Sequence, residues 1–173
     1  VVGYMGIVNS GSVAVPLDAQ LPSSDLCDLI NRADVTTLLF DESKAQTASE
    51  ALKSCPNLKH VISMSEESSV EGALMFWKLI GEQNSGFDYS PLPEDLATIM
   101  FTSGTTGKSK GVMLTHRNLA ENATCLDMKI EPGTVIMSVL PIHHAYCLSM
   151  DILKGLSLGS VICINDSLLR VAK

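Results

Sequence analysis

The sequence predicts an α/β fold in which a mainly parallel sheet is flanked by helices. Apolar stretches of strand length alternate along the chain with segments whose apolar residues recur at helical spacing. Alternation of this kind is typical of strand–helix–strand units, which build parallel sheets. Hydrophobic residues make up 46% of the 173 residues and charged residues 18%, so the chain has enough apolar side chains for a substantial core.

The first expected elements alternate regularly. A short strand at 13–15 precedes a helix that opens at Pro22, and a buried strand at 35–40 precedes a helix at 45–52. A further strand is expected at 59–64. The apolar face of the first helix consists of Leu26, Leu29, Ile30 and Ala33.

The segment 65–93 has the least regular pattern. Its Ser/Glu-rich start leads into an expected amphipathic helix at 70–80, and Pro91 and Pro93 interrupt the chain after it. We therefore place an internal boundary here. The two expected portions of the chain are residues 1–93 and residues 94–173.

The second portion continues the alternation. A loop rich in glycine and threonine separates its first two strands. The expected strands are 96–101, 111–114, 135–140 and 160–164, and the expected helices are about 116–128 and 145–156.

Composition disfavours several classes of function. A formal net charge of −7 argues against a general binder of nucleic acids or anionic membranes. The five cysteines are scattered, odd in number and never in a C-x-x-C pair, which favours free thiols in a reducing cytoplasm over a disulfide framework or a zinc site.

The most apolar region, 135–164, is interrupted by charged residues, so no transmembrane segment is expected. The N-terminus lacks a basic signal-peptide region and begins in mid-pattern, so we expect the chain to be a piece of a longer protein.

The loop between the first two strands of the second portion has the chemistry of a phosphate site. It reads Thr-Ser-Gly-Thr-Thr-Gly-Lys-Ser-Lys-Gly from Thr102 to Gly111. Gly104 and Gly107 allow tight turns and a close approach of the backbone to an anion. Hydroxyl groups, backbone N–H groups and two lysines supply donors and positive charge. An ordinary surface loop of similar composition is the alternative.

The loop is not a Walker A sequence. That motif has four residues between its glycines, whereas two separate Gly104 from Gly107, and Thr102 stands where the first glycine would be. The residues after the loop also form a strand pattern, whereas a Walker loop opens directly into a helix.

The loop resembles instead the signature of the adenylate-forming superfamily, which comprises acyl-CoA and aryl-CoA synthetases, peptide-synthetase adenylation domains and luciferases. The signature runs Thr-Ser-Gly-Thr-Thr-Gly, any residue, Pro-Lys-Gly, and Ser109 in place of the proline is the one departure. Loss of that ring is expected to loosen the second half of the loop. The resemblance implies that the chain is part of the large N-terminal α/β domain of such an enzyme.

Two further segments agree with this superfamily in the expected order. Residues 12–18 are similar to its Gly-Ala-Val-Pro-Leu-Asp segment, and residues 140–146 are similar to its Leu-Pro-Leu-x-His segment. The second similarity places His144 on the superfamily's histidine, beside the acyl end of the substrate. The alternative for His143 and His144 is a structural pair at the start of a helix, with hydrogen bonds to backbone groups. The resemblance favours a functional role for His144 alone.

The resemblance also implies a reaction. A carboxylate attacks the α-phosphorus of ATP to give an acyl-adenylate and pyrophosphate, and many members then transfer the acyl group to coenzyme A. Mg²⁺ accompanies ATP, and no protein metal ligand is assigned. Lys110 is assigned as the catalytic counter-charge, with Lys108 a weaker candidate. Contacts to the β- and γ-phosphates are assigned to Thr102, Ser103, Gly104, Thr105, Thr106 and Gly107.

The superfamily's later Tyr-Gly-x-Thr-Glu segment, ribose-binding aspartate, hinge and C-terminal lysine have no match here, so we expect these 173 residues alone to be inactive. The run from Pro141 to Tyr146 favours a fatty acid–CoA ligase. A peptide-synthetase-type adenylation domain and a non-catalytic nucleotide-sensing relative are the alternatives. The expected partners are therefore a small carboxylic acid, ATP, CoA and the remainder of the chain, with no nucleic acid.

Overall fold

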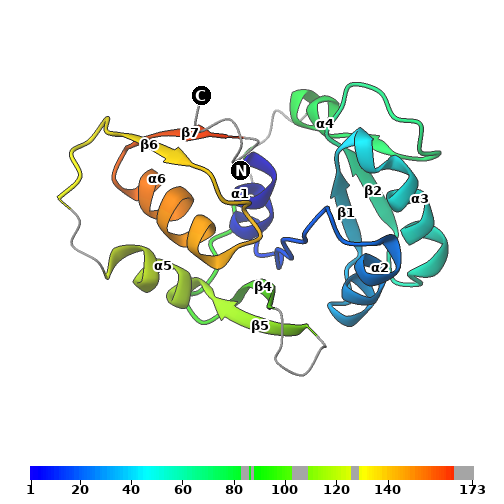
Figure 1. Ribbon diagram of the computed structural model, residues 1–173, viewed down its shortest axis with the longest axis horizontal. Helices are drawn as coiled ribbons and strands as arrows, with labels where there is room; N and C mark the ends of the chain where they lie inside the picture. The colour runs from blue at the N-terminus through cyan, green and yellow to red at the C-terminus, as the bar shows by residue number, and fades with distance from the viewer. Residues whose placement is uncertain (83–85, 87, 103–108, 126–128, 166–173) are drawn as a thin grey trace. The chain divides into compact units, whose positions relative to one another are not determined.

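The computed structural model describes residues 1–82, 86, 88–102, 109–125 and 129–165 (Figure 1). The chain forms two compact units: Leu17–Asp88 is one, and Val1–Pro16 together with Tyr89–Lys173 is the other. The division expected between residues 93 and 94 stays a prediction. In the structure the first residues pack with the second half of the chain, because Ala14 pairs in parallel with Thr98.

The unit Leu17–Asp88 is built on a parallel sheet in the order β1-β2-β3, with a helix before β1, one between β1 and β2, and one after β3 (Figure 1). The strands are β1 (Thr37–Phe40), β2 (His60–Ser63) and β3 (Leu74–Met75). The helices are α2 (Ser23–Arg32), the 3₁₀ turn η1 (Glu42–Lys44), α3 (Ala45–Ser54) and α4 (Phe76–Glu82).

The core of this unit confirms the expected helix face. Leu26, Leu29 and Ile30 of α2 are buried, as predicted, and Ile30 packs in one cluster with Phe40 of β1 and Val61 of β2. The spacing of three and four residues along α2 places these side chains on one stripe, and α2 packs against α3.

The helix expected at 70–80 is wrong over its first half. Gly72 adopts φ +76°, a left-handed conformation that ends any helix, and β3 then pairs with β2 before α4 begins at Phe76. The turn before Gly72 is held by Glu42, whose carboxylate accepts hydrogen bonds from the Ser69 hydroxyl at 2.6 Å and the Ser69 N–H at 2.7 Å. These bonds, with others from neighbouring serines, lower the pKa of Glu42 to about 2.

The other unit contains two separate pairs of strands. Strands β4 and β5 pair antiparallel, and strands β6 and β7 pair in parallel (Figure 1). The elements are α1 (Val2–Asn9), β4 (Leu96–Thr102), β5 (Lys110–Thr115), α5 (His116–Thr124), β6 (Val135–Ser138), the π-helix η2 (Cys147–Lys154), α6 (Gly155–Ser157) and β7 (Val161–Ile164).

The α/β prediction is confirmed, and three differences in this unit are informative. The sequence analysis assigned no element to α1, whose run of apolar residues lacks a helical stripe. The strand expected at 13–15 is a single bridge at Ala14. The helix expected at 145–156 is mainly a π-helix, followed by the short α6. A further core cluster here joins Tyr4 and Val8 of α1 to Met100 of β4.

Candidate nucleotide-binding site

The β4–β5 hairpin brings the two ends of the candidate phosphate loop together. Thr102, the last residue of β4, is the register partner of Lys110, the first residue of β5. The Thr102 hydroxyl lies 3.5 Å from the Lys110 carbonyl oxygen, which it faces as a donor. Both residues are exposed, so their side chains are accessible to a ligand.

The other five predicted phosphate contacts lie outside the described residues. They are Ser103, Gly104, Thr105, Thr106 and Gly107, and Lys108 lies there too. Their roles stay predictions. The hairpin nevertheless closes the loop over a short span, because an antiparallel register fixes the separation of its two ends.

Strand β4 is anchored from the N-terminal side by the segment around Ala14. The Ala14 N–H donates to the Ala97 carbonyl at 2.9 Å, and the Ala14 carbonyl accepts from the Ile99 N–H at 2.9 Å. The fully buried Thr98 hydroxyl donates to the same Ala14 carbonyl at 2.7 Å. The stretch 12–18, which the sequence analysis singled out, therefore supports the strand that leads into the loop.

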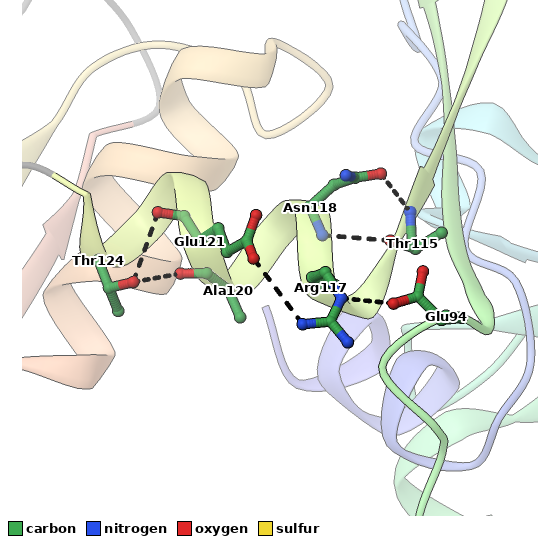
Figure 2. A network of polar contacts seen from close by, with 7 residues as sticks. All are labelled: Glu94, Thr115, Arg117, Asn118, Ala120, Glu121 and Thr124. Atoms are coloured by element: carbon green, nitrogen blue, oxygen red, sulfur yellow. Dashed lines mark hydrogen bonds and ion pairs between the residues drawn. The ribbon is translucent and has the colours of Figure 1, made fainter.

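The base of the hairpin is fixed where β5 enters α5 (Figure 2). The Thr115 hydroxyl accepts from the Asn118 N–H at 3.2 Å, and the Asn118 side chain accepts from the Thr115 N–H at 3.1 Å. This reciprocal pair is a capping box, which stabilises the first turn of a helix.

Arg117 adds a second set of bonds at this base. Its guanidinium donates to the Glu94 carboxylate and lies 3.9 Å from a Glu121 oxygen, and the Glu94 bond raises the pKa of Arg117 (Figure 2). The Arg117 N–H also donates to the Pro93 carbonyl at 2.8 Å. The chain before β4 is thus tied to the chain after β5, which leaves the opposite end of the hairpin to carry the loop.

His144 lies in the turn between β6 and η2. Its N–H donates to the Pro141 carbonyl at 2.9 Å, and its carbonyl accepts from the Leu148 N–H at 3.1 Å. The ring is exposed and lies against the His143 ring, with centroids 4.6 Å apart and the planes tilted by 35°. His144 and the hairpin belong to the same compact unit. A direct approach of His144 to the phosphate loop stays a prediction.

Sequence reasoning missed three buried polar side chains, two at the ends of this turn and a third at the far end of η2. Ser138 ends β6, Cys147 begins η2 and Lys154 ends η2, and each is at most 4% exposed. Lys154 donates to the Ala123 carbonyl at 3.1 Å, in the last turn of α5. The sequence offered one signal, a lysine inside the most apolar part of the chain, but that signal does not distinguish a buried cation from an exposed one.

Neither a metal centre nor a membrane span is found in the described parts of the chain. Those residues contain no group of three or more His, Cys, Asp or Glu side chains that could hold a metal ion. The same residues include no helix that is long and apolar enough to cross a bilayer.

Comparison with known proteins decides the family. The family described as AMP-binding enzyme matches residues 1–172, nearly the whole chain. The chain belongs to the AMP-binding enzyme family.

Relatives of this AMP-binding chain include CoA ligases for several acids. It is 33% identical over 166 residues to long-chain-fatty-acid–CoA ligase 5 of Rattus norvegicus, covering 84% of this chain and 24% of the relative. It is 27% identical over 170 residues to a crotonobetaine/carnitine–CoA ligase of Salmonella paratyphi A, covering 94% and 33%. The chain thus spans about a quarter to a third of the length of these relatives.

Solved structures of adenylate-forming enzymes share the fold. ATP-bound MatB from Rhodopseudomonas palustris superposes with a TM-score of 0.80 at 26% identity, covering 95% of this chain and 32% of that protein. A red-emitting luciferase from Phrixothrix hirtus superposes with a TM-score of 0.82 at 21% identity, covering 95% and 34%, and this likeness concerns the fold alone. The resemblance inferred from the loop is therefore confirmed at the level of family and fold.

Proposed function

We propose that this AMP-binding chain is the phosphate-loop part of an ATP-dependent acid–CoA ligase. In this proposal the enzyme activates a carboxylate, preferentially a fatty acid, as acyl-AMP and transfers the acyl group to CoA. The observation that carries it is the hairpin register, which pairs Thr102 with Lys110 on either side of the loop that contains Thr-Ser-Gly-Thr-Thr-Gly. The relatives named as long-chain-fatty-acid–CoA ligases support the choice of acid.

The chemistry asked of these residues is positioning and charge stabilisation. A carboxylate oxygen forms a bond to the α-phosphorus while the bond to the β-phosphate oxygen breaks, and pyrophosphate leaves. Backbone N–H groups and the hydroxyls of the loop, with Thr102 at its start, would bind the β- and γ-phosphate oxygens on which negative charge accumulates. Lys110 would place a cation beside them. Mg²⁺ belongs to the proposal as a companion of the phosphates, since Mg²⁺ is commonly held through substrate phosphates.

His144 is proposed to bind the acyl end of the substrate. Its exposed imidazole can donate a hydrogen bond to a carboxylate oxygen, and its backbone is fixed on both sides by the bonds to Pro141 and Leu148. A fixed backbone reduces the entropy lost when the substrate is oriented.

We also propose a cytoplasmic location and a longer polypeptide around these residues. The cysteines Cys27, Cys55, Cys125, Cys147 and Cys163 are all free thiols in the structure, which suits a reducing compartment. The fraction of each relative that the chain spans supports the longer polypeptide.

The test is thioester formation by the full-length protein with ATP, Mg²⁺, CoA and a panel of carboxylic acids. Fatty acids are expected to give acyl-CoA and AMP, with short and aromatic acids giving less product. AMP without thioester would contradict the ligase assignment and favour an adenylation domain that serves a carrier protein. No acid-dependent AMP at all would favour the nucleotide-sensing alternative.

The isolated 173-residue polypeptide is expected to be inactive, because the segments that the resemblance assigns to adenine, ribose and the C-terminal lysine have no match in it. Acid-dependent exchange of radioactive pyrophosphate into ATP measures this directly. Robust exchange by the isolated polypeptide would show that these segments are dispensable.

A further inference from the structure

The turn that carries His144 is closed at its base by two buried side chains. The Ser138 hydroxyl and the Cys147 thiol lie 3.3 Å apart, which is within hydrogen-bond distance for sulfur. Ser138 is 2% exposed and Cys147 is 1% exposed. We call this contact the Ser138–Cys147 clamp. It joins residues nine positions apart, and His144 lies between them.

Both ends of the clamp belong to regular secondary structure. Ser138 is the register partner of Ile164, and its carbonyl accepts from the Asn165 N–H at 2.9 Å, so β7 holds it. Cys147 begins η2, in which the next residue, Leu148, is also 1% exposed. The clamp therefore joins the end of β6 directly to the start of η2, and the turn 139–146, which carries the exposed His144, connects the same two points along the chain.

His144 depends on the same helix start as Cys147. The Leu148 N–H donates to the His144 carbonyl at 3.1 Å, and Leu148 directly follows Cys147. A displacement of the start of η2 would consequently move the His144 backbone. The π-helix η2 spans eight residues, and π-helices are rare and frequently lie at functional sites.

The chemistry of the two groups suits a clamp better than a reactive site. Burial raises the pKa of the Cys147 thiol, so it stays protonated near neutral pH and can act as a donor. A protonated, inaccessible thiol is a poor nucleophile. Ser138, in turn, is 2% exposed, so a substrate has little access to its hydroxyl.

We propose that Ser138 and Cys147 are positioning residues that set the location of His144 for binding the carboxylate substrate. This inference rests on the proposed function. It assigns a role in substrate binding to two residues that the substrate itself does not touch.

The test compares Cys147→Ala, Cys147→Ser and Ser138→Ala in the full-length protein, with Cys55→Ala as the matched control. Cys55 is equally buried, at 1% exposed, and lies in the other compact unit. Two measurements are made on each variant. Hydrogen exchange followed by mass spectrometry reports the order of the turn 139–146, and acid-dependent pyrophosphate exchange gives separate KM values for the carboxylate and for ATP.

Cys147→Ala and Ser138→Ala are expected to speed amide hydrogen exchange over 139–146. They are also expected to raise the KM for the carboxylate about threefold to tenfold, which corresponds to the net free energy of one hydrogen bond. The KM for ATP should change less than twofold. Cys147→Ser keeps a hydroxyl donor and should give an intermediate KM for the carboxylate. Cys55→Ala should leave both the exchange of 139–146 and the ratio of the two KM values at the wild-type level.

If amide hydrogen exchange over 139–146 is unchanged in both alanine variants, the clamp does not order this turn and the proposal is overturned. Faster exchange with equal changes in the two KM values would reduce the clamp to a packing contact and overturn the positioning role. If the wild-type protein activates no carboxylate, the proposed function fails, and the positioning role fails with it. Amide hydrogen exchange over 139–146 still tests the clamp in that case, so failure of the clamp and failure of the proposed function are distinguishable.

Discussion

Replacing Thr98 with valine should lower the free energy of unfolding by about 1 kcal/mol, the net contribution of one neutral hydrogen bond. The Thr98 side chain is fully buried in β4, and its hydroxyl donates to the Ala14 carbonyl at 2.7 Å. Valine has nearly the same shape, so the substitution removes the bond without opening a cavity. The hydroxyl joins residues 84 positions apart, which makes it a direct link between the N-terminal segment and β4.

The size of this effect follows from what remains after the substitution. The Ala14 carbonyl keeps its second bond, from the Ile99 N–H at 2.9 Å, so this buried acceptor is not left without a partner. The larger cost of an unsatisfied buried group, about 1–3 kcal/mol, therefore does not apply. For a chain of this size a loss of about 1 kcal/mol lowers the melting temperature by roughly 2–4 °C.

Urea unfolding followed by circular dichroism measures this change, and Thr124→Val is the matched control. The Thr124 hydroxyl donates to the Ala120 carbonyl at 2.8 Å, a bond of similar length that is exposed on α5 (Figure 2). The Thr98 variant should shift the urea midpoint at constant m, and the control should shift it by less than half as much. Equal shifts in the two variants, or no shift for Thr98→Val, would refute the argument that burial gives this bond its value.

Three further changes test other parts of the structure. In the full-length protein, Lys110→Ala should slow adenylation about tenfold or more, whereas the exposed Lys59→Ala should not; unchanged pyrophosphate release in the first variant would remove Lys110 from the mechanism. Glu42→Gln should destabilise the protein at pH 7, because a carboxyl whose folded pKa of about 2 lies below its ordinary value of 4.5 stabilises the fold above pH 4.5. The difference in the free energy of unfolding between variant and wild type should shrink as the pH falls from 4.5 toward 2. Identical acid unfolding of the two proteins would contradict this prediction. Iodoacetamide at pH 7.5 should modify the exposed cysteines before the buried ones, and peptide mass mapping would show the order. The exposed pair is Cys125 and Cys163, and the buried pair is Cys55, with a pKa raised to about 11, and Cys147.

Sequence alone predicted the elements with clear apolar patterns. The stripe of α2 follows from helical spacing, and β1, β2 and the two strands that flank the phosphate loop follow from apolar runs of strand length. The loop motif then identified the family, because the ten residues from Thr102 to Gly111 resemble the superfamily's signature with one departure, at Ser109.

Other features depend on tertiary contacts that no local pattern encodes. The spacing of residues 70–75 predicts helix, yet Gly72 and the bonds from Ser69 to Glu42 hold the chain in a turn there, and Leu74–Met75 then form β3. The clamp between Ser138 and Cys147 could not be predicted either, because this chain has serines and cysteines in both buried and exposed positions. Residue type alone could not distinguish these two from the other serines and cysteines of the chain.

The central claim is that this phosphate loop serves attack of a carboxylate on the α-phosphorus of ATP, and oxygen isotope transfer tests it most directly. The full-length protein is incubated with ATP, Mg²⁺, CoA and a fatty acid whose carboxylate carries ¹⁸O, and the nucleotide product is weighed by mass spectrometry. Formation and cleavage of an acyl-adenylate must leave one carboxylate oxygen on AMP, so the account predicts AMP that contains ¹⁸O together with unlabelled pyrophosphate. Unlabelled AMP, or ADP as the product, would contradict it.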